Sequence, residues 1–101
     1  MFPRLREVIQ PDEFLEQCRE IEQDIRRVDV QLEAIVWAVA RNPEVFARVT
    51  ENVHVVETFA LGPDDEYAFI YFTIDNENTC TLRWIERGSE VVAGPNSVPV
   101  L

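Results

Sequence analysis

The sequence predicts one α+β domain, in which a helical hairpin packs on one face of a small antiparallel β-sheet. Apolar residues recur at helical spacing in the first half of the chain. The second half holds short apolar or alternating segments that are typical of strands, and turn-forming residues separate them. The chain has 101 residues, of which 47% are hydrophobic, which is enough for a single domain with a buried core.

A short strand is expected over Leu5 to Ile9, ahead of Gln10-Pro11. Proline lacks the N–H group that a continuing strand needs, but it suits the first turn of a helix. We therefore expect a helix to begin at Pro11. Apolar residues then follow in steps of four and three, at Phe14, Cys18, Ile21, Ile25, Val28, Leu32, Ile35 and Val39. This spacing indicates one continuous helical stripe.

The stripe fits either one helix from Pro11 to Arg41 or two helices with a break near Asp29. A single helix over this range would be about 46 Å long, which exceeds what a compact domain of this size can cover. The hairpin is preferred, with Asp29 as the N-cap of the second helix. That helix should end near Arg41-Asn42, because the residue before Pro43 disfavours the α conformation. A further turn is expected over Glu44 to Val49.

Three antiparallel strands are expected in the second half of the chain. The first runs from Val53 to Ala60 and leads into a turn over Leu61 to Glu66. The segment from Tyr67 to Ile74 is aromatic and apolar on both faces, so it should lie at the centre of the sheet. A hairpin loop at Asp75 to Asn78 connects it to a last strand over Thr79 to Glu86.

An odd-numbered hairpin loop separates polar from apolar side chains on these two strands. One face then carries Ala68, Ile70, Phe72, Ile74, Cys80, Leu82 and Trp84. The other face carries Tyr67, Phe69, Tyr71, Arg83, Ile85 and Arg87. An even-numbered loop would place Arg83 among the apolar side chains, because a slip of one residue reverses every side chain. The odd loop is therefore preferred.

The folded domain is expected to cover residues 1–87, followed by a tail over residues 88–101. This tail contains Gly94-Pro95 and Pro99, and Glu90 is its only charged residue. We expect the tail to be either flexible or docked on a partner. Trp37 and Trp84 are expected in the core between helices and sheet, where each would bury a large apolar area. His54 is interpreted as a half-buried strand residue.

Charge and cysteine content restrict the functional classes. Nineteen acidic and nine basic residues, all of the latter arginines, give a net charge of -10, which disfavours nucleic acid as a partner. Cys18 and Cys80 form no CxxC pair and there is one histidine, so no metal site and no cofactor are expected. Both cysteines should be reduced and buried. No stretch resembles a membrane span or a secretory signal, which favours a cytoplasmic location.

Three segments carry a resemblance to a known family. The first is Ala34-Ile35-Val36-Trp37-Ala38-Val39-Ala40-Arg41-Asn42-Pro43, the second is Tyr67-Ala68-Phe69-Ile70-Tyr71-Phe72-Thr73-Ile74-Asp75, and the third is Leu82-Arg83-Trp84-Ile85-Glu86-Arg87. With the order strand, helical hairpin and three antiparallel strands, the chain resembles the RelE/ParE toxin superfamily of bacterial toxin–antitoxin modules. The similarity covers Val8 to Arg87.

The resemblance implies one possible activity. Ribonuclease members of the family cleave mRNA on the ribosome, using basic side chains and often a tyrosine or histidine. Arg83 and Arg87 lie in the matching closing strand, and Tyr71 or Tyr67 would position a base or relay a proton. A guanidinium at such a site stabilises the charge that develops on a phosphate during cleavage. This makes Arg83, Arg87 and Tyr71 the candidate catalytic residues.

Protein–protein contact is the preferred function. Glu66 stands where the family usually has arginine, and family toxins tend to be basic. Tyr67, Phe69, Tyr71 and Ile85 form the expected binding surface, because aromatic residues flanked by arginines favour interface centres. The expected partner is an antitoxin-like protein or a second copy of the chain. The alternatives are an endoribonuclease using Arg83 and Arg87, and an acidic nucleic-acid mimic that binds a basic partner.

Overall fold

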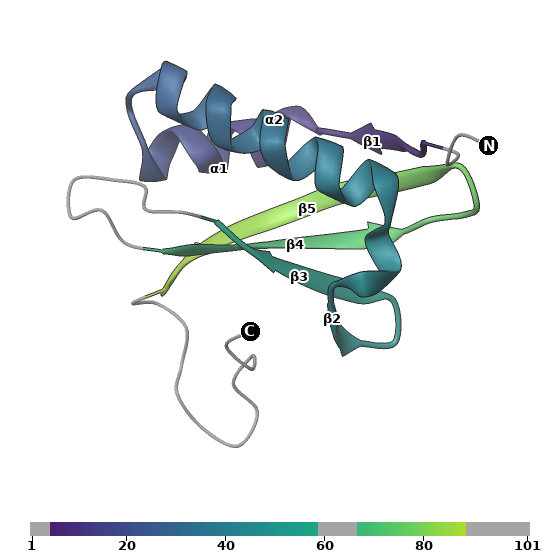
Figure 1. The fold of residues 1–101 in the computed structure, drawn as a ribbon. Helices are drawn as coiled ribbons and strands as arrows, with labels where there is room; N and C mark the ends of the chain where they lie inside the picture. The colour runs from purple at the N-terminus through teal and green to yellow at the C-terminus, as the bar shows by residue number, and fades with distance from the viewer. Residues whose placement is uncertain (1–4, 59–66, 89–101) are drawn as a thin grey trace.

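A computed structural model of the protein describes residues 5–58 and 67–88, and it has the predicted α+β fold. Two helices, α1 (Asp12–Ile21) and α2 (Ile25–Arg41), lie on one face of a five-stranded sheet (Figure 1). The strands are β1 (Glu7–Ile9), β2 (Ala47–Thr50), β3 (Val53–Glu57), β4 (Ala68–Ile74) and β5 (Thr79–Arg87). Their order in the sheet is β1-β5-β4-β3-β2.

Strand β4 occupies the centre of the sheet, as its two apolar faces predict. It pairs antiparallel with β3 and with β5, whereas β1 pairs parallel with β5. The sequence did not predict β2, which lies where a turn was expected and follows the short 3₁₀ helix η1 (Pro43–Val45). This edge strand is short, mostly exposed and irregular between Arg48 and Thr50, so it lacks the alternation by which strands are recognised.

The helical hairpin is present, but it breaks earlier than predicted. Residues 22–24 connect the helices, and Asp24 is the N-cap of α2, where its carboxylate accepts a hydrogen bond from the Arg26 amide at 3.0 Å. The prediction of Asp29 as the cap was wrong, since Asp29 lies within α2. Both aspartates precede sequence that is suitable for a helix. The cap falls at Asp24 because α1 already ends at Glu22, where the backbone is extended. That side chain is buried and forms an ion pair with Arg27 at 3.0 Å.

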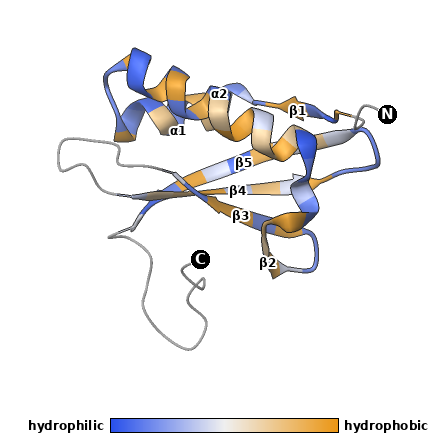
Figure 2. Cartoon of the chain, in the orientation of Figure 1, coloured by the Kyte–Doolittle hydropathy of each residue, from blue (hydrophilic) through white to orange (hydrophobic). Residues whose placement is uncertain are grey.

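The main core lies between the helices and the sheet (Figure 2). Its largest fully buried side chains include Phe14 of α1, Val39 of α2, and Ile70, Phe72 and Leu82 of the sheet. Cys18 and Cys80 are free and buried in this core, as predicted. Burial raises the pKa of the Cys18 thiol to about 11, so this cysteine is not a nucleophile at neutral pH.

The β4–β5 hairpin follows the predicted register only near its loop. Ile74 pairs with Cys80 and Phe72 with Leu82, but the register shifts between Tyr71 and Phe72. Tyr71 therefore pairs with Trp84, and Ile70 with Ile85. The predicted faces of Trp84 and Ile85 were consequently wrong. A β-bulge adds one residue to one strand, which exchanges the faces of all residues beyond it.

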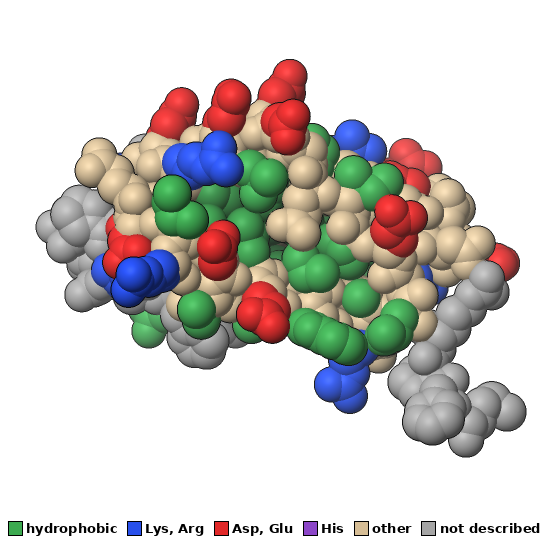
Figure 3. Space-filling model, turned by 90° about the horizontal axis from the view of Figure 1, so that it is seen from above, with side chains coloured by type: hydrophobic (Ala, Val, Ile, Leu, Met, Phe, Trp, Pro, Cys, Tyr) green, Lys and Arg blue, Asp and Glu red, His purple; other side chains and the backbone are tan. Residues whose placement is uncertain are grey.

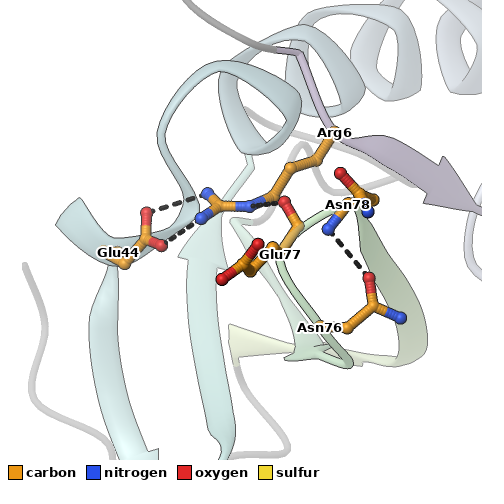
Figure 4. Close-up of polar contacts among 5 residues, drawn as sticks. All are labelled: Arg6, Glu44, Asn76, Glu77 and Asn78. Carbon is orange, nitrogen blue, oxygen red and sulfur yellow. Dashed lines mark hydrogen bonds and ion pairs between the residues drawn. The ribbon is translucent and has the colours of Figure 1, made fainter.

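Arg6 ties the first strand to two distant parts of the chain (Figure 4). Its guanidinium donates two hydrogen bonds to the Glu44 carboxylate after α2, one of them at 3.0 Å, and a third to the carbonyl of Glu77 in the β4–β5 loop at 3.0 Å. The backbone amide of Arg6 donates to the carbonyl of Ala40. Such bidentate contacts fix the position of the edge strand β1 against α2.

No helix within the described residues is long and apolar enough to cross a membrane. The turn expected over Leu61 to Glu66, the end of the strand expected up to Ala60, and the tail over residues 89–101 lie outside these residues.

Candidate functional site

Arg83 lies beside the β4–β5 loop, in a network of polar side chains. Its Nε atom donates to the Thr73 hydroxyl at 2.9 Å, and its guanidinium forms an ion pair with Asp75 at 3.3 Å. Asp75 also accepts hydrogen bonds from the hydroxyls of Thr73 and Thr81. Although burial alone would raise the pKa of Asp75, the hydrogen bonds from Thr81 and Thr73 and the charge of Arg83 lower it. These contacts hold the guanidinium beside the loop, next to the Asp75 carboxylate.

Arg87 lies elsewhere, at the far end of β5. It contributes with Glu20, Glu22 and Ile21 to a pocket of about 350 Å³ at the end of α1, on the helix side of the sheet. Arg83 and Arg87 are four positions apart on β5, which corresponds to about 13 Å along a strand. The structure therefore does not bring the two candidate catalytic arginines together.

Tyr71 packs on the sheet face opposite to the helices. Its ring stacks on Trp84 and its hydroxyl donates to the Glu86 carboxylate at 3.2 Å. Burial, together with the charge and the hydrogen bond of Glu86, raises the pKa of Tyr71 to about 12. The phenol therefore stays protonated at neutral pH and is unsuited to act as a general base.

The expected binding row is mostly covered. Tyr67 is 57% exposed, but Phe69 and Tyr71 are only 7% and 4% exposed, so the prediction that these two rings are open to a partner was wrong. They form a second apolar cluster with Val55, against which Trp84 also packs. Ile85 belongs to the main core on the other side. Of the four expected binding residues, only Tyr67 offers a large exposed surface.

An open apolar surface exists instead on the helix side, between α1 and α2. A groove of about 420 Å³ is lined by Gln10, Leu15, Arg19, Asp29, Leu32, Glu33, Val36 and Trp37. Leu15, Leu32 and Val36 form its apolar part, whereas Asp29 and Glu33 are exposed acidic residues of α2. Figure 3, which views this side, shows hydrophobic side chains in a hollow with acidic side chains around them.

Trp37 borders this groove and is 55% exposed. The prediction that it packs in the core was wrong, because Ile35 and Val39 occupy the side of α2 that faces the sheet. Tryptophan is highly buried on average in folded proteins, and it is enriched at the centres of protein interfaces. The signal in the sequence was the unbroken apolar run Ala34 to Ala40, which is more than a helix with one buried side needs.

His54, which was interpreted from the sequence as a half-buried strand residue, is more deeply buried than expected. It is buried on β3, its ring stacks on Phe72 at 5.4 Å, and its Nδ1 atom has no hydrogen-bond partner among the residues that the structure describes. Burial and the nearby charge of Arg48 lower the pKa of His54, while Glu44 opposes this shift. The imidazole is therefore neutral at physiological pH and belongs to the packing of the sheet.

Comparisons with protein families, with curated proteins and with solved structures find no match for this chain. In residues 5–58 and 67–88, no three His, Cys, Asp or Glu side chains are grouped so as to hold a metal ion. The groove between α1 and α2, with Trp37 at its border, is accordingly the candidate functional site.

Proposed function

We propose that the protein is a RelE/ParE-like, toxin–antitoxin-related protein that acts by protein–protein contact and not by catalysis. The observation that carries this proposal is the open apolar groove between α1 and α2 with Trp37 at its border. Large aromatic side chains beside an apolar pocket supply most of the binding energy at protein interfaces. The order of strand, helical hairpin and antiparallel strands supports the resemblance.

The candidate catalytic residues support the same conclusion. Arg83 is held by Asp75 and Thr73, Arg87 lies on the helix side at the other end of β5, and Tyr71 has a raised pKa. Phosphate cleavage needs cationic groups that converge on one phosphate. These three side chains do not converge.

Charge indicates what kind of partner fits the groove. The protein carries a net charge of -10, and Asp29 and Glu33 line the groove against the single cation Arg19. A partner segment with apolar side chains flanked by lysine or arginine would complement it. We therefore propose an antitoxin-like partner that inserts such a segment between the helices.

Co-expression with the product of a small antitoxin-like reading frame directly beside the gene for this protein tests the proposal. We expect the two proteins to co-elute in size-exclusion chromatography, and we expect Trp37→Glu to abolish the complex. Val45→Glu is the matched control, because Val45 is also an exposed apolar residue but does not line the groove. The Arg83→Ala, Arg87→Ala double variant should still bind. A complex that survives Trp37→Glu, or growth arrest that requires both arginines, contradicts the proposal.

A further inference from the structure

Helix α2 is apolar on two sides, although only one of them faces the sheet. Val28, Leu32, Ile35 and Val39 are buried against the core. On the opposite side, Val30 is 66% exposed and Trp37 is 55% exposed, and Ala34 and Ala38 are exposed between and beside them. An amphipathic surface helix normally presents charged residues on its outer side. The outer side of α2 therefore has the composition of a helix that packs against another helix.

Two charged residues next to this outer side, Glu33 and Arg41, are arranged symmetrically about Trp37. Glu33 lies four residues before it and Arg41 four residues after it, so each is about one turn away along the helix. The two are about 12 Å apart along the axis, which is too far for a pair within one helix. Neither side chain makes a hydrogen bond or an ion pair with the part of the chain that the structure describes.

We propose that a second copy of the chain packs antiparallel on this side of α2, with the two-fold axis close to Trp37. In such an isologous contact, Glu33 of one protomer faces Arg41 of its partner, and the same pair occurs again on the other side of the axis. Ala34 and Ala38 leave room for the Trp37 ring of the partner. Helix axes approach to about 8–10 Å when small residues alternate with large ones at the contact.

The local charge distinguishes a second copy from the basic partner proposed for the groove. The protein as a whole is strongly acidic, but on this stripe the charges of Glu33 and Arg41 cancel, and Arg26 lies on the same side. A strongly basic segment would meet two arginines there. A second copy instead places Glu33 opposite Arg41 on both sides of the axis. This inference does not rest on the proposed function, but the two contacts share Trp37 and Glu33, so a partner segment in the groove would compete with the second copy.

Sedimentation velocity of the purified protein over a range of concentrations, in about 0.15 M salt, tests the contact. We expect a monomer–dimer equilibrium for the wild type and for the Val45→Glu control. The single variants Glu33→Arg and Arg41→Glu should each weaken the dimer about tenfold or more, because each places like charges opposite one another twice. Circular dichroism verifies that both variants fold, which is expected since both positions are exposed.

An equimolar mixture of the two single variants provides the sharpest test. In a mixed dimer, the substituted arginine faces the substituted glutamate, and the native Arg41 of one protomer faces the native Glu33 of the other. The mixture should therefore dimerise at least as well as the wild type, although each variant alone does not. The Glu33→Arg, Arg41→Glu double variant should also dimerise. A wild type that stays monomeric up to millimolar concentration, single variants that dimerise normally, or a mixture that remains monomeric would each overturn the proposal.

Discussion

Trp84 and Tyr71 lie face to face across the β4–β5 pair, with 4.7 Å between their ring centroids and 18° between their planes. This contact exists because the β-bulge in β5 turns Trp84 away from the helices. Together the rings cover part of the sheet face that no described helix protects, and the Tyr71 hydroxyl is anchored on Glu86. The relationship identifies Tyr71 as a structural residue of the outer cluster.

The two tryptophans should therefore differ in their contribution to stability. Trp84→Ala removes a stacked, partly buried ring and should lower the free energy of unfolding by about 2 kcal/mol. Trp37→Ala, at an exposed position, should change it by less than about 0.5 kcal/mol. Urea unfolding followed by circular dichroism measures both. Equal losses for the two variants would show that Trp37 is buried in solution.

His54 should make the protein less stable in mild acid. Its folded-state pKa is lowered from the ordinary value of 6.5, so the unfolded chain binds the proton more readily. The contribution of neutral His54 to stability is present above that value and is lost as the pH falls below it. His54→Phe keeps the ring on Phe72 and removes the titration. Urea unfolding at pH 5 and pH 7.5, compared between wild type and variant, should show a smaller loss in acid for the variant. Identical pH dependence would contradict the buried, unpartnered imidazole.

Asp75 should stabilise the β4–β5 hairpin only while it is ionised. Its folded-state pKa lies below the ordinary value of 3.8, so its contribution is present above pH 4 and disappears as the pH falls through the folded-state value. Asp75→Ala removes the acceptor of Thr73, Thr81 and Arg83, and should cost about 1–2 kcal/mol at pH 7. Chemical unfolding at pH 7 and at about pH 2 measures the difference. A cost that persists unchanged in acid would disagree with this assignment.

Alanine substitutions of Asp24 and of Asp29 test which aspartate is the N-cap of α2. Asp24→Ala removes the carboxylate that accepts from the Arg26 amide, and should lower the free energy of unfolding by about 1 kcal/mol. Asp29→Ala lies inside the helix and should have an effect within about 0.5 kcal/mol. Thermal unfolding of the two variants provides the comparison. A larger loss of stability for Asp29→Ala than for Asp24→Ala would instead support Asp29 as the N-cap, as predicted from the sequence.

Periodicity was sufficient to predict most of this fold. The buried residues of both helices, apart from Ala40, follow the apolar stripe, and the apolar segment up to Ile74 forms the central strand. The errors occur where the same sequence pattern fits two structures equally well. Two aspartates could each cap α2, and a bulge cannot be recognised from alternation, because its extra residue leaves the sequence pattern of β5 intact. The exposed strand β2 had no apolar face to reveal it.

The candidate site was less predictable because it depends on which surfaces cover one another. The sequence placed Phe69 and Tyr71 correctly on the side away from the helices, but burial of these rings is a tertiary property. Trp37 was assigned to the core because its segment is apolar throughout. Only the packing of Ile35 and Val39 against the sheet shows that Trp37 remains outside.

Isothermal titration calorimetry with the product of an antitoxin-like reading frame beside this gene measures the contribution of Trp37 to partner binding. We expect Trp37→Ala to weaken binding at least about tenfold, whereas Val45→Ala, at another exposed apolar position, should leave the Kd unchanged. Equal affinities for the wild type and Trp37→Ala would contradict the claim that the groove between α1 and α2 binds a partner.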